Sequence, residues 1–254
     1  MDLDLGGRIV LVTGGVRGVG LGISEVFAGQ GATVVTCARR PVEGLPYEFH
    51  SCDVRDPDAV GALVGAIVDR HGRLDVVVNN AGGSPYALAA EASPRFHQKV
   101  IELNLLGMLY VSLAANAVMQ QQSGGGSIIS ISSVSGRRPS PGTAAYGAAK
   151  AGVDSLTATL GVEWAPKVRV NAVVAGMVAT EQAELFYGDS ESQAAVAGTV
   201  PLGRLAQPED IGWAAAFLAS DAASYISGAA LPVLGGGEPP AFLSVSAANT
   251  KETR

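Results

Sequence analysis

The chain has few cysteines, few aromatic residues and little charge, and these shortages exclude several classes of protein. Its 254 residues include two cysteines, Cys37 and Cys52, too few for a disulfide framework or a cysteine-rich metal site. The charged residues, 16% of the chain, sum to a net charge of −6. Bulk charge therefore gives no basis for binding nucleic acid. Aromatic residues make up only 6%, which argues against an aromatic-packed sandwich.

Signals for membranes, export and metals are also missing. No uninterrupted apolar run reaches 18 residues, so we expect no membrane span. The acidic start M-D-L-D-L-G lacks the basic residues that precede the apolar run of a signal peptide. The three histidines, His50, His71 and His97, stand in separate segments without a carboxylate or cysteine at ligand spacing. We therefore expect a cytoplasmic protein that binds no metal.

What the chain does have is apolar residues, at 48%, and 33 glycines. Short apolar runs alternate with longer helical patterns, which predicts a parallel sheet covered by helices on both faces. We expect a single Rossmann-type, doubly wound α/β domain of about seven strands over residues 1–237, followed by a tail at 238–254. The irregular stretch at about 179–200 is the candidate substrate lid. The segments predict strands at 8–12, 33–36, 47–51, 74–78, 127–132, 168–174 and 229–233, and helices at 18–30, 57–71, 93–122, 144–164 and 208–219.

A glycine-rich turn follows the first expected strand. Its sequence, T-G-G-V-R-G-V-G from Thr13 to Gly20, lets the backbone approach a pyrophosphate at the start of a helix. Such a turn is a weak signal by itself, because ordinary strand–helix turns also contain glycine. Its position after the first apolar strand favours dinucleotide binding.

The end of the second expected strand predicts which dinucleotide is bound. An acidic residue there usually holds a free ribose 2′-hydroxyl, whereas arginine suits a 2′-phosphate. This chain has Ala38 and Arg39 at that point, and Arg17 stands in the glycine-rich turn. We therefore expect NADP(H), with NAD(H) as the alternative. The alternative interpretation is that these arginines are solvated surface charges.

Tyr146 and Lys150 form the strongest pair of chemical groups. They are four residues apart on an expected helix, so their side chains share one face. An ammonium near a phenol stabilises the phenolate and lowers the tyrosine pKa, which is otherwise near 10. A lone pair of this spacing is common by chance. Here it follows a strand that ends in hydroxyl residues, including Ser133.

With these motifs in order, the sequence resembles the short-chain dehydrogenase/reductase family over roughly residues 5–237, and it is similar to 3-oxoacyl-thioester reductases. The resemblance rests on the glycine turn, C-D-V at 52–54, N-N-A-G at 79–82, Asn104, Ser133, the Tyr146–Lys150 pair and two C-terminal segments. It departs at Ala175-Gly176, where relatives usually have Pro-Gly, which puts the nicotinamide carboxamide contacts in doubt.

The resemblance implies a role for each residue. Tyr146 exchanges the proton of the carbonyl or hydroxyl oxygen, and Ser133 stabilises that oxygen. Lys150 lowers the tyrosine pKa and holds the nicotinamide ribose, and Asn104 anchors a water relay. Together with Tyr146 and Lys150, the implied cofactor contacts are Gly14, Arg17, Gly18, Val19, Gly20, Ala38, Arg39, Asp53, Val54, Asn80, Ala81, Gly82, Gly176, Val178 and Thr180.

These residues favour an oxidoreductase that transfers a hydride between NADP(H) and a secondary alcohol or ketone. The expected small-molecule substrate is a 3-oxoacyl thioester or a cyclic, steroid-like ketone. The alternative is a catalytically idle dinucleotide-binding sensor or scaffold on the same fold.

Relatives pair through long helices, so we expect a homotetramer or, failing that, a dimer. The adjacent Arg137 and Arg138 are either an exposed basic pair or a contact for an anionic substrate.

Overall fold

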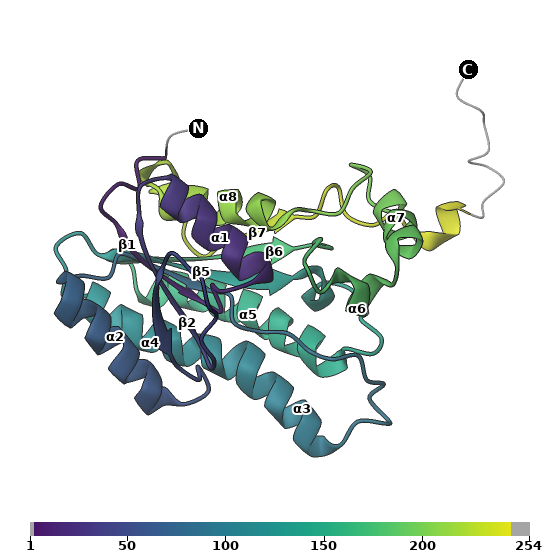
Figure 1. Ribbon diagram of the computed structural model, residues 1–254, viewed down its shortest axis with the longest axis horizontal. Helices are drawn as coiled ribbons and strands as arrows, with labels where there is room; N and C mark the ends of the chain where they lie inside the picture. The colour runs from purple at the N-terminus through teal and green to yellow at the C-terminus, as the bar shows by residue number, and fades with distance from the viewer. Residues whose placement is uncertain (1–2, 245–254) are drawn as a thin grey trace.

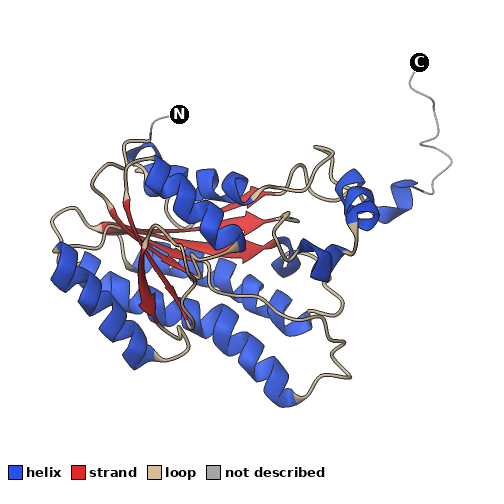
Figure 2. Cartoon of the chain, viewed as in Figure 1, coloured by secondary structure: helices blue, strands red, loops and turns tan. Residues whose placement is uncertain are grey.

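A seven-stranded, wholly parallel sheet forms the centre of the computed structural model, which describes residues 3–244 (Figures 1 and 2). The strand order β3-β2-β1-β4-β5-β6-β7 confirms the expected doubly wound fold. All six neighbouring pairs are parallel. The strands are β1 (Ile9–Thr13), β2 (Thr33–Ala38), β3 (Glu48–Ser51), β4 (Val76–Asn79), β5 (Gly126–Ser133), β6 (Val168–Ala175) and β7 (Ala230–Val233).

Helices cover both faces of the sheet, as Figure 1 shows. On one face α1 and α8 pack together over a core that contains Ile23, Phe27 and Ile211. On the other face α2, α4 and α5 cover a second core. The helices are α1 (Gly18–Gly29), α2 (Pro57–His71), α3 (Pro94–Ile101), α4 (Gly107–Met119), α5 (Ala144–Glu163), α6 (Ala183–Tyr187), α7 (Ser190–Gly198) and α8 (Pro208–Ala219).

Local sequence signals account for the ends of α2. Its N-cap is Asp56, whose carboxylate accepts hydrogen bonds from the N–H groups of Asp58 and Ala59 at 3.0 and 3.3 Å. Pro57 occupies the first turn, where its missing N–H has no intrahelical partner to lose. The helix ends at Gly72, which has φ = 75°, a left-handed conformation that glycine adopts without strain.

The helix expected over 93–122 is interrupted. Between α3 and α4, residues Glu102–Leu106 form a π-helical turn that contains Asn104. By length and mean hydropathy, the combined run Pro94–Met119 could cross a membrane. Its residues Val111, Ala115 and Met119 are instead buried in the core beneath the sheet. Of its most apolar window, 39% is buried inside the protein, so part of the run belongs to the core.

The candidate lid contains regular structure, whereas the sequence indicated an irregular stretch. Residues 179–200 contain the short helices α6 and α7. Asp189 caps α7, because its carboxylate accepts the N–H of Ser192 at 2.9 Å. In the segment expected as a tail, Ala241–Ser244 form a short 3-10 turn, and residues 245–254 lie outside the described part of the chain.

Candidate active site

The chemistry-bearing segments gather at the carboxyl edge of the sheet. Thr13 ends β1, Asn79 ends β4, Ser133 ends β5 and Ala175 ends β6. Because these strands are parallel and adjacent in the sheet, the loops that follow them meet on one side of the molecule. This is the edge at which open α/β sheets bind their ligands.

The loop after β1 has the shape that a pyrophosphate requires. Gly14 and Gly18 have φ = 65° and 51°, so a side chain at either position would be strained. A Cβ at Gly20 would lie 2.1 Å from the carbonyl oxygen of Gly14. Arg17 is exposed at the N-cap of α1. The absence of side chains at this helix start and the neighbouring cation fit a bound dinucleotide.

Asn80 holds the glycine loop in place. Its side-chain N–H donates to the carbonyls of Thr13 at 3.0 Å and Gly14 at 3.3 Å. In return, the hydroxyl oxygen of Thr13 accepts the main-chain N–H groups of Asn80 and Ala81, each at 3.0 Å. The amide of Asn80 thus bonds to the loop itself, and the cofactor contact expected for Asn80 stays a prediction.

The end of β2 lies next to the glycine loop, because the N–H of Gly14 donates to the carbonyl of Cys37 at 2.8 Å. Arg39 follows on the surface, close enough for its charge to help lower the pKa of Asp53. The larger cause of that lowered pKa is Arg55, which donates to the two carboxylate oxygens of Asp53 at 2.9 and 2.6 Å.

Val54, which the resemblance assigned to the cofactor, is buried. It packs at the start of α4, where its Cγ2 would lie 3.0 Å from a Cβ at Gly107.

Ser133, Tyr146 and Lys150 converge at the carboxyl end of β5. The hydroxyl of Ser133 is close enough to Tyr146 to act on the pKa of its phenol. The Nζ of Lys150 lies 5.5 Å from the centroid of the Tyr146 ring and donates to the carbonyl of Ile131 at 2.7 Å. A Cβ at Gly147 would lie 2.7 Å from the carbonyl oxygen of Ser135, so this glycine allows α5 to approach the loop after β5 closely.

The pKa of Tyr146 differs from the expectation that Lys150 lowers it. Burial raises the tyrosine pKa, and the neighbouring hydroxyl of Ser133 acts in the opposite direction. Lys150 itself is buried, which lowers its pKa from 10.5 to about 8 because a buried ammonium loses its hydration. The lysine therefore keeps its charge at neutral pH but loses it under mildly alkaline conditions.

Asn104 lies beside Lys150 but uses its side chain on the main chain. The amide exchanges hydrogen bonds with Gly83, at 2.8 and 2.9 Å, and donates to the carbonyl of Val100 at 2.9 Å. A Cβ at Gly82 would lie 2.6 Å from Oδ1 of Asn104 and 3.5 Å from Nζ of Lys150. The π-helical turn thus places Asn104 against the loop after β4, and its part in a proton relay stays a prediction.

The segment after β6 returns to the glycine loop. The N–H of Gly176 donates to the carbonyl of Val233 at 3.0 Å, and Val178 forms a parallel bridge with Ala206. The methyl group of Thr180 would lie 3.6 Å from a Cβ at Gly18. Thr180 is therefore next to the candidate phosphate loop, and Ala175 precedes Gly176 where the resemblance led us to expect proline.

Tyr187, at the end of α6, brings the lid close to Tyr146. Its pKa is raised by burial, and the N–H of Val178 together with the charges of Arg138 and Glu238 also act on it. Tyr187 in turn contributes to the raised pKa of Tyr146.

Arg137 and Arg138 each have an acidic partner. Arg137 pairs with Asp154 at 2.9 Å and Arg138 with Glu238 at 2.7 Å. Neither acid was indicated as part of the site by the sequence, because each is distant along the chain from the arginine it pairs with.

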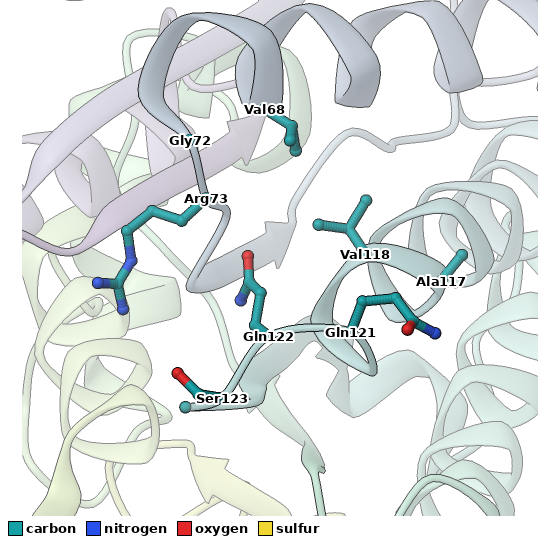
Figure 3. Close-up of a pocket in the computed structure, with 9 residues that line it drawn as sticks. Val68, Gly72, Arg73, Ala117, Val118, Gln121, Gln122 and Ser123 are labelled. Carbon is teal, nitrogen blue, oxygen red and sulfur yellow. The ribbon is translucent and has the colours of Figure 1, made fainter.

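A hollow of about 610 Å³ lies at the other edge of the sheet (Figure 3). It is bounded by the end of α2, near Gly72, and by the end of α4, near Gln121. The amide of Gln122, which lines it, is bonded to the main chain of Leu74 and Gly125. These segments precede β4 and β5, so the hollow is separate from the carboxyl edge where Tyr146 lies.

Comparison with known proteins agrees with this geometry. A family model described as enoyl-(acyl carrier protein) reductase matches residues 14–238. The chain belongs to the short-chain dehydrogenase/reductase family. Members of this family are oxidoreductases, and the protein is an NAD(P)-dependent dehydrogenase or reductase.

Similar family members act on different substrates. The chain is 34% identical to the 3-oxoacyl-[acyl-carrier-protein] reductase of Thermotoga maritima, over 92% of this chain and 99% of that protein. It is 36% identical to the 2-dehydro-3-deoxy-D-gluconate 5-dehydrogenase of Pseudoalteromonas atlantica, over 92% and 96% of the two chains. The ligand-free aldohexose dehydrogenase of Thermoplasma acidophilum superposes with a TM-score of 0.88 at 32% identity, covering 97% of this chain and 98% of that one.

Proposed function

We propose that the protein interconverts a secondary alcohol and a ketone with NADP(H), using Tyr146 as the acid or base. The observation that carries this proposal is the convergence of Ser133, Tyr146 and Lys150 at the carboxyl end of β5. Tyr146 donates its proton to the carbonyl oxygen in reduction and receives it in oxidation. Ser133 stabilises the charge that develops on the same oxygen. The bound nicotinamide supplies or accepts the hydride.

Several residues support NADP(H) as the cofactor. An acid that would bind a 2′-hydroxyl is missing at Ala38, while Arg39 is close to Asp53 and Arg17 is exposed on the glycine loop. A guanidinium bound to a phosphate makes charge-assisted, often bidentate hydrogen bonds. Gly14, Gly18, Val19, Gly20, Ala81 and Gly82 would line the dinucleotide, and Gly176, Val178 and Thr180 the nicotinamide end.

Exposed apolar residues in the loop after β4 and in the candidate lid support an apolar carbonyl substrate. The ring of Tyr86 packs so closely against Gly142 that a Cβ added to this glycine would lie 2.0 Å from a ring carbon. Leu88, in the same loop, and Leu185 and Phe186, in the lid, are exposed. Arg137 and Arg138 are already paired with acids, so the exposed apolar residues, and not this basic pair, support the choice of substrate. We therefore infer a 3-oxoacyl thioester as the substrate, with a cyclic ketone as the second candidate.

The long helices support a homotetramer. Leu113 on α4 is 50% exposed and Val162 on α5 is 79% exposed, so each helix leaves apolar surface uncovered. A second copy of the chain would bury these residues. The lid at 179–200 and the catalytic region 1–237 would belong to each subunit.

The decisive experiment follows NAD(P)H absorbance with 3-oxoacyl thioesters, steroids, quinones and small ketones, in wild type and Tyr146→Phe. We expect turnover of a ketone and a loss of at least ~10²-fold in the variant, with cofactor binding retained. Tyr225→Phe is the control, because Tyr225 is fully exposed. Cofactor binding without turnover of any substrate would instead indicate an idle dinucleotide-binding protein, and an active Tyr146→Phe would refute the mechanism.

A further inference from the structure

Helix α5 carries three titratable side chains on one face. Tyr146, Lys150 and Asp154 are spaced four residues apart, so they lie in a row along the helix. Lys150 is buried, and the side chain of Asp154 is 19% exposed. A carboxylate therefore follows the lysine on the side away from Tyr146.

Asp154 is held from outside the helix by Arg137. Its Oδ2 accepts a hydrogen bond from Nε of Arg137 at 2.9 Å, and Arg137 also donates to the carbonyl of Ala230 at 3.3 Å. The other carboxylate oxygen, Oδ1, is buried and has no hydrogen-bond partner among the described residues. Since Arg137 lies four residues after Ser133, this ion pair joins the serine loop to the helix of Tyr146 and Lys150.

Lys150 lacks a directly bonded counter-ion. The hydrogen bond recorded for its Nζ goes to the neutral carbonyl of Ile131, and within residues 3–244 no ion pair involves it. Burial favours loss of its proton, and the charge of Asp154 opposes that loss. Of the other groups around the lysine, Tyr146 is uncharged at neutral pH and Asn104 does not titrate.

We propose that Asp154 is a positioning residue that keeps Lys150 protonated beside Tyr146, and that Arg137 limits this effect by pairing with the same carboxylate. The inference rests on the proposed function, because the charge of Lys150 affects turnover only if Lys150 and Tyr146 act in the reaction. It adds two residues that do not touch the substrate. Both control the pH range in which the lysine is charged.

Two substitutions separate this role from a structural one. Asp154→Asn and Arg137→Gln break the same ion pair, so any loss of rigidity should be similar in both. Their electrostatic effects on Lys150 are opposite. The first removes the negative charge and makes the lysine lose its proton at lower pH. The second leaves the carboxylate without its cation, so the lysine keeps its proton to higher pH.

The first measurement is kcat as a function of pH from 6 to 10. We expect the midpoint of the alkaline decline to fall by about one pH unit in Asp154→Asn. At the wild-type midpoint this lowers kcat about fivefold, because about a tenth of the enzyme then keeps the proton. In Arg137→Gln the midpoint should rise. The control is Asp221→Asn, which breaks the exposed ion pair with Arg8 and should leave the midpoint unchanged.

The second measurement needs neither cofactor nor substrate. Because the pKa of Lys150 is lower in the fold than its ordinary 10.5, the unfolded chain binds more protons between about pH 8 and 10.5. The free energy of unfolding therefore contains a contribution from Lys150 that rises with pH across this range. In Asp154→Asn this rise should begin at lower pH. When Lys150→Met is added to both the wild type and Asp154→Asn, the difference between the two pH profiles should disappear.

The outcomes distinguish the inference from the function on which it rests. Midpoints that stay fixed, or that move in the same direction in both variants, would show that the Arg137–Asp154 pair is only structural. Full activity of Tyr146→Phe would refute the proposed function. In that case the unfolding experiment still tests whether Asp154 controls the protonation of Lys150.

Discussion

The ammonium of Lys150 lies over the ring of Tyr146, 5.5 Å from its centroid, while its hydrogen bond goes to the carbonyl of Ile131. The charge therefore acts on the face of the ring, whereas Ser133 acts on the pKa of the phenol itself. Because the recorded hydrogen bond of Lys150 goes to Ile131 and not to the phenol, burial is the largest influence on the pKa of Tyr146, and it raises that pKa. We therefore expect the protonation state of Lys150 to affect turnover separately from that of Tyr146.

The pH dependence of turnover should reveal the loss of the proton from Lys150. Lys150 has a pKa of about 8, so it is charged below that pH and neutral above it. We expect kcat to decline as the pH rises through about 8. In Lys150→Arg this decline should disappear, because arginine stays protonated throughout the range, although kcat itself should drop since the guanidinium is larger. A decline near pH 8 that persists in this variant would assign it to another group.

The glycine loop should tolerate no side chain at Gly20, where it approaches the main chain of Gly14 most closely. Gly20→Ala places a methyl group 2.1 Å from the carbonyl oxygen of Gly14. We expect it to lower the free energy of unfolding by ~1–3 kcal/mol and to weaken cofactor binding, as measured by denaturant titration and nucleotide fluorescence. Gly29→Ala, in the same helix, meets no atom within 4 Å and should be neutral or stabilising by up to ~1 kcal/mol. Equal effects of the two substitutions would contradict the close approach.

Cofactor preference should follow the charge at the end of β2. Wild type should prefer NADP(H) by roughly ten- to a hundredfold in kcat/KM, the equivalent of about 1.5–3 kcal/mol for one good guanidinium–phosphate contact. Ala38→Asp combined with Arg39→Leu should move the preference toward NAD(H). Arg40→Leu removes a neighbouring exposed arginine and should change little. An NAD(H)-preferring wild type, or a double variant with unaltered preference, would count against NADP(H).

Subunit association should depend on the uncovered faces of α4 and α5. Light scattering at micromolar concentration should give four times the 25.7 kDa chain mass, or twice that mass if only one interface forms. Leu113→Asp should shift the distribution toward smaller species, because it places a charge in an apolar contact. Val42→Asp, at another exposed apolar residue, should leave the mass unchanged. A wild-type particle of the mass of one chain would refute the tetramer.

The sheet and its helices could be predicted because apolar runs and end signals such as Asp56 and Gly72 act locally. The π-helical turn at Asn104 could not, since one extra residue in a single turn hardly changes the helical periodicity of a 30-residue pattern. The raised pKa of Tyr146 depends on burial, which tertiary packing decides. The bonds from the amide of Asn80 to Thr13 and Gly14 could not be predicted either, because they join segments that are far apart in the sequence.

The hydrogen bonds between Asn80 and the Thr13–Gly14 segment also have a kinetic consequence. Every one of them joins two parts of the chain itself, so the curvature of the phosphate loop is built in and association with a nucleotide includes no step in which the loop folds. The rate of encounter should then depend mainly on long-range attraction of the anionic nucleotide by Arg17 and Arg39. It should slow as added salt screens that attraction.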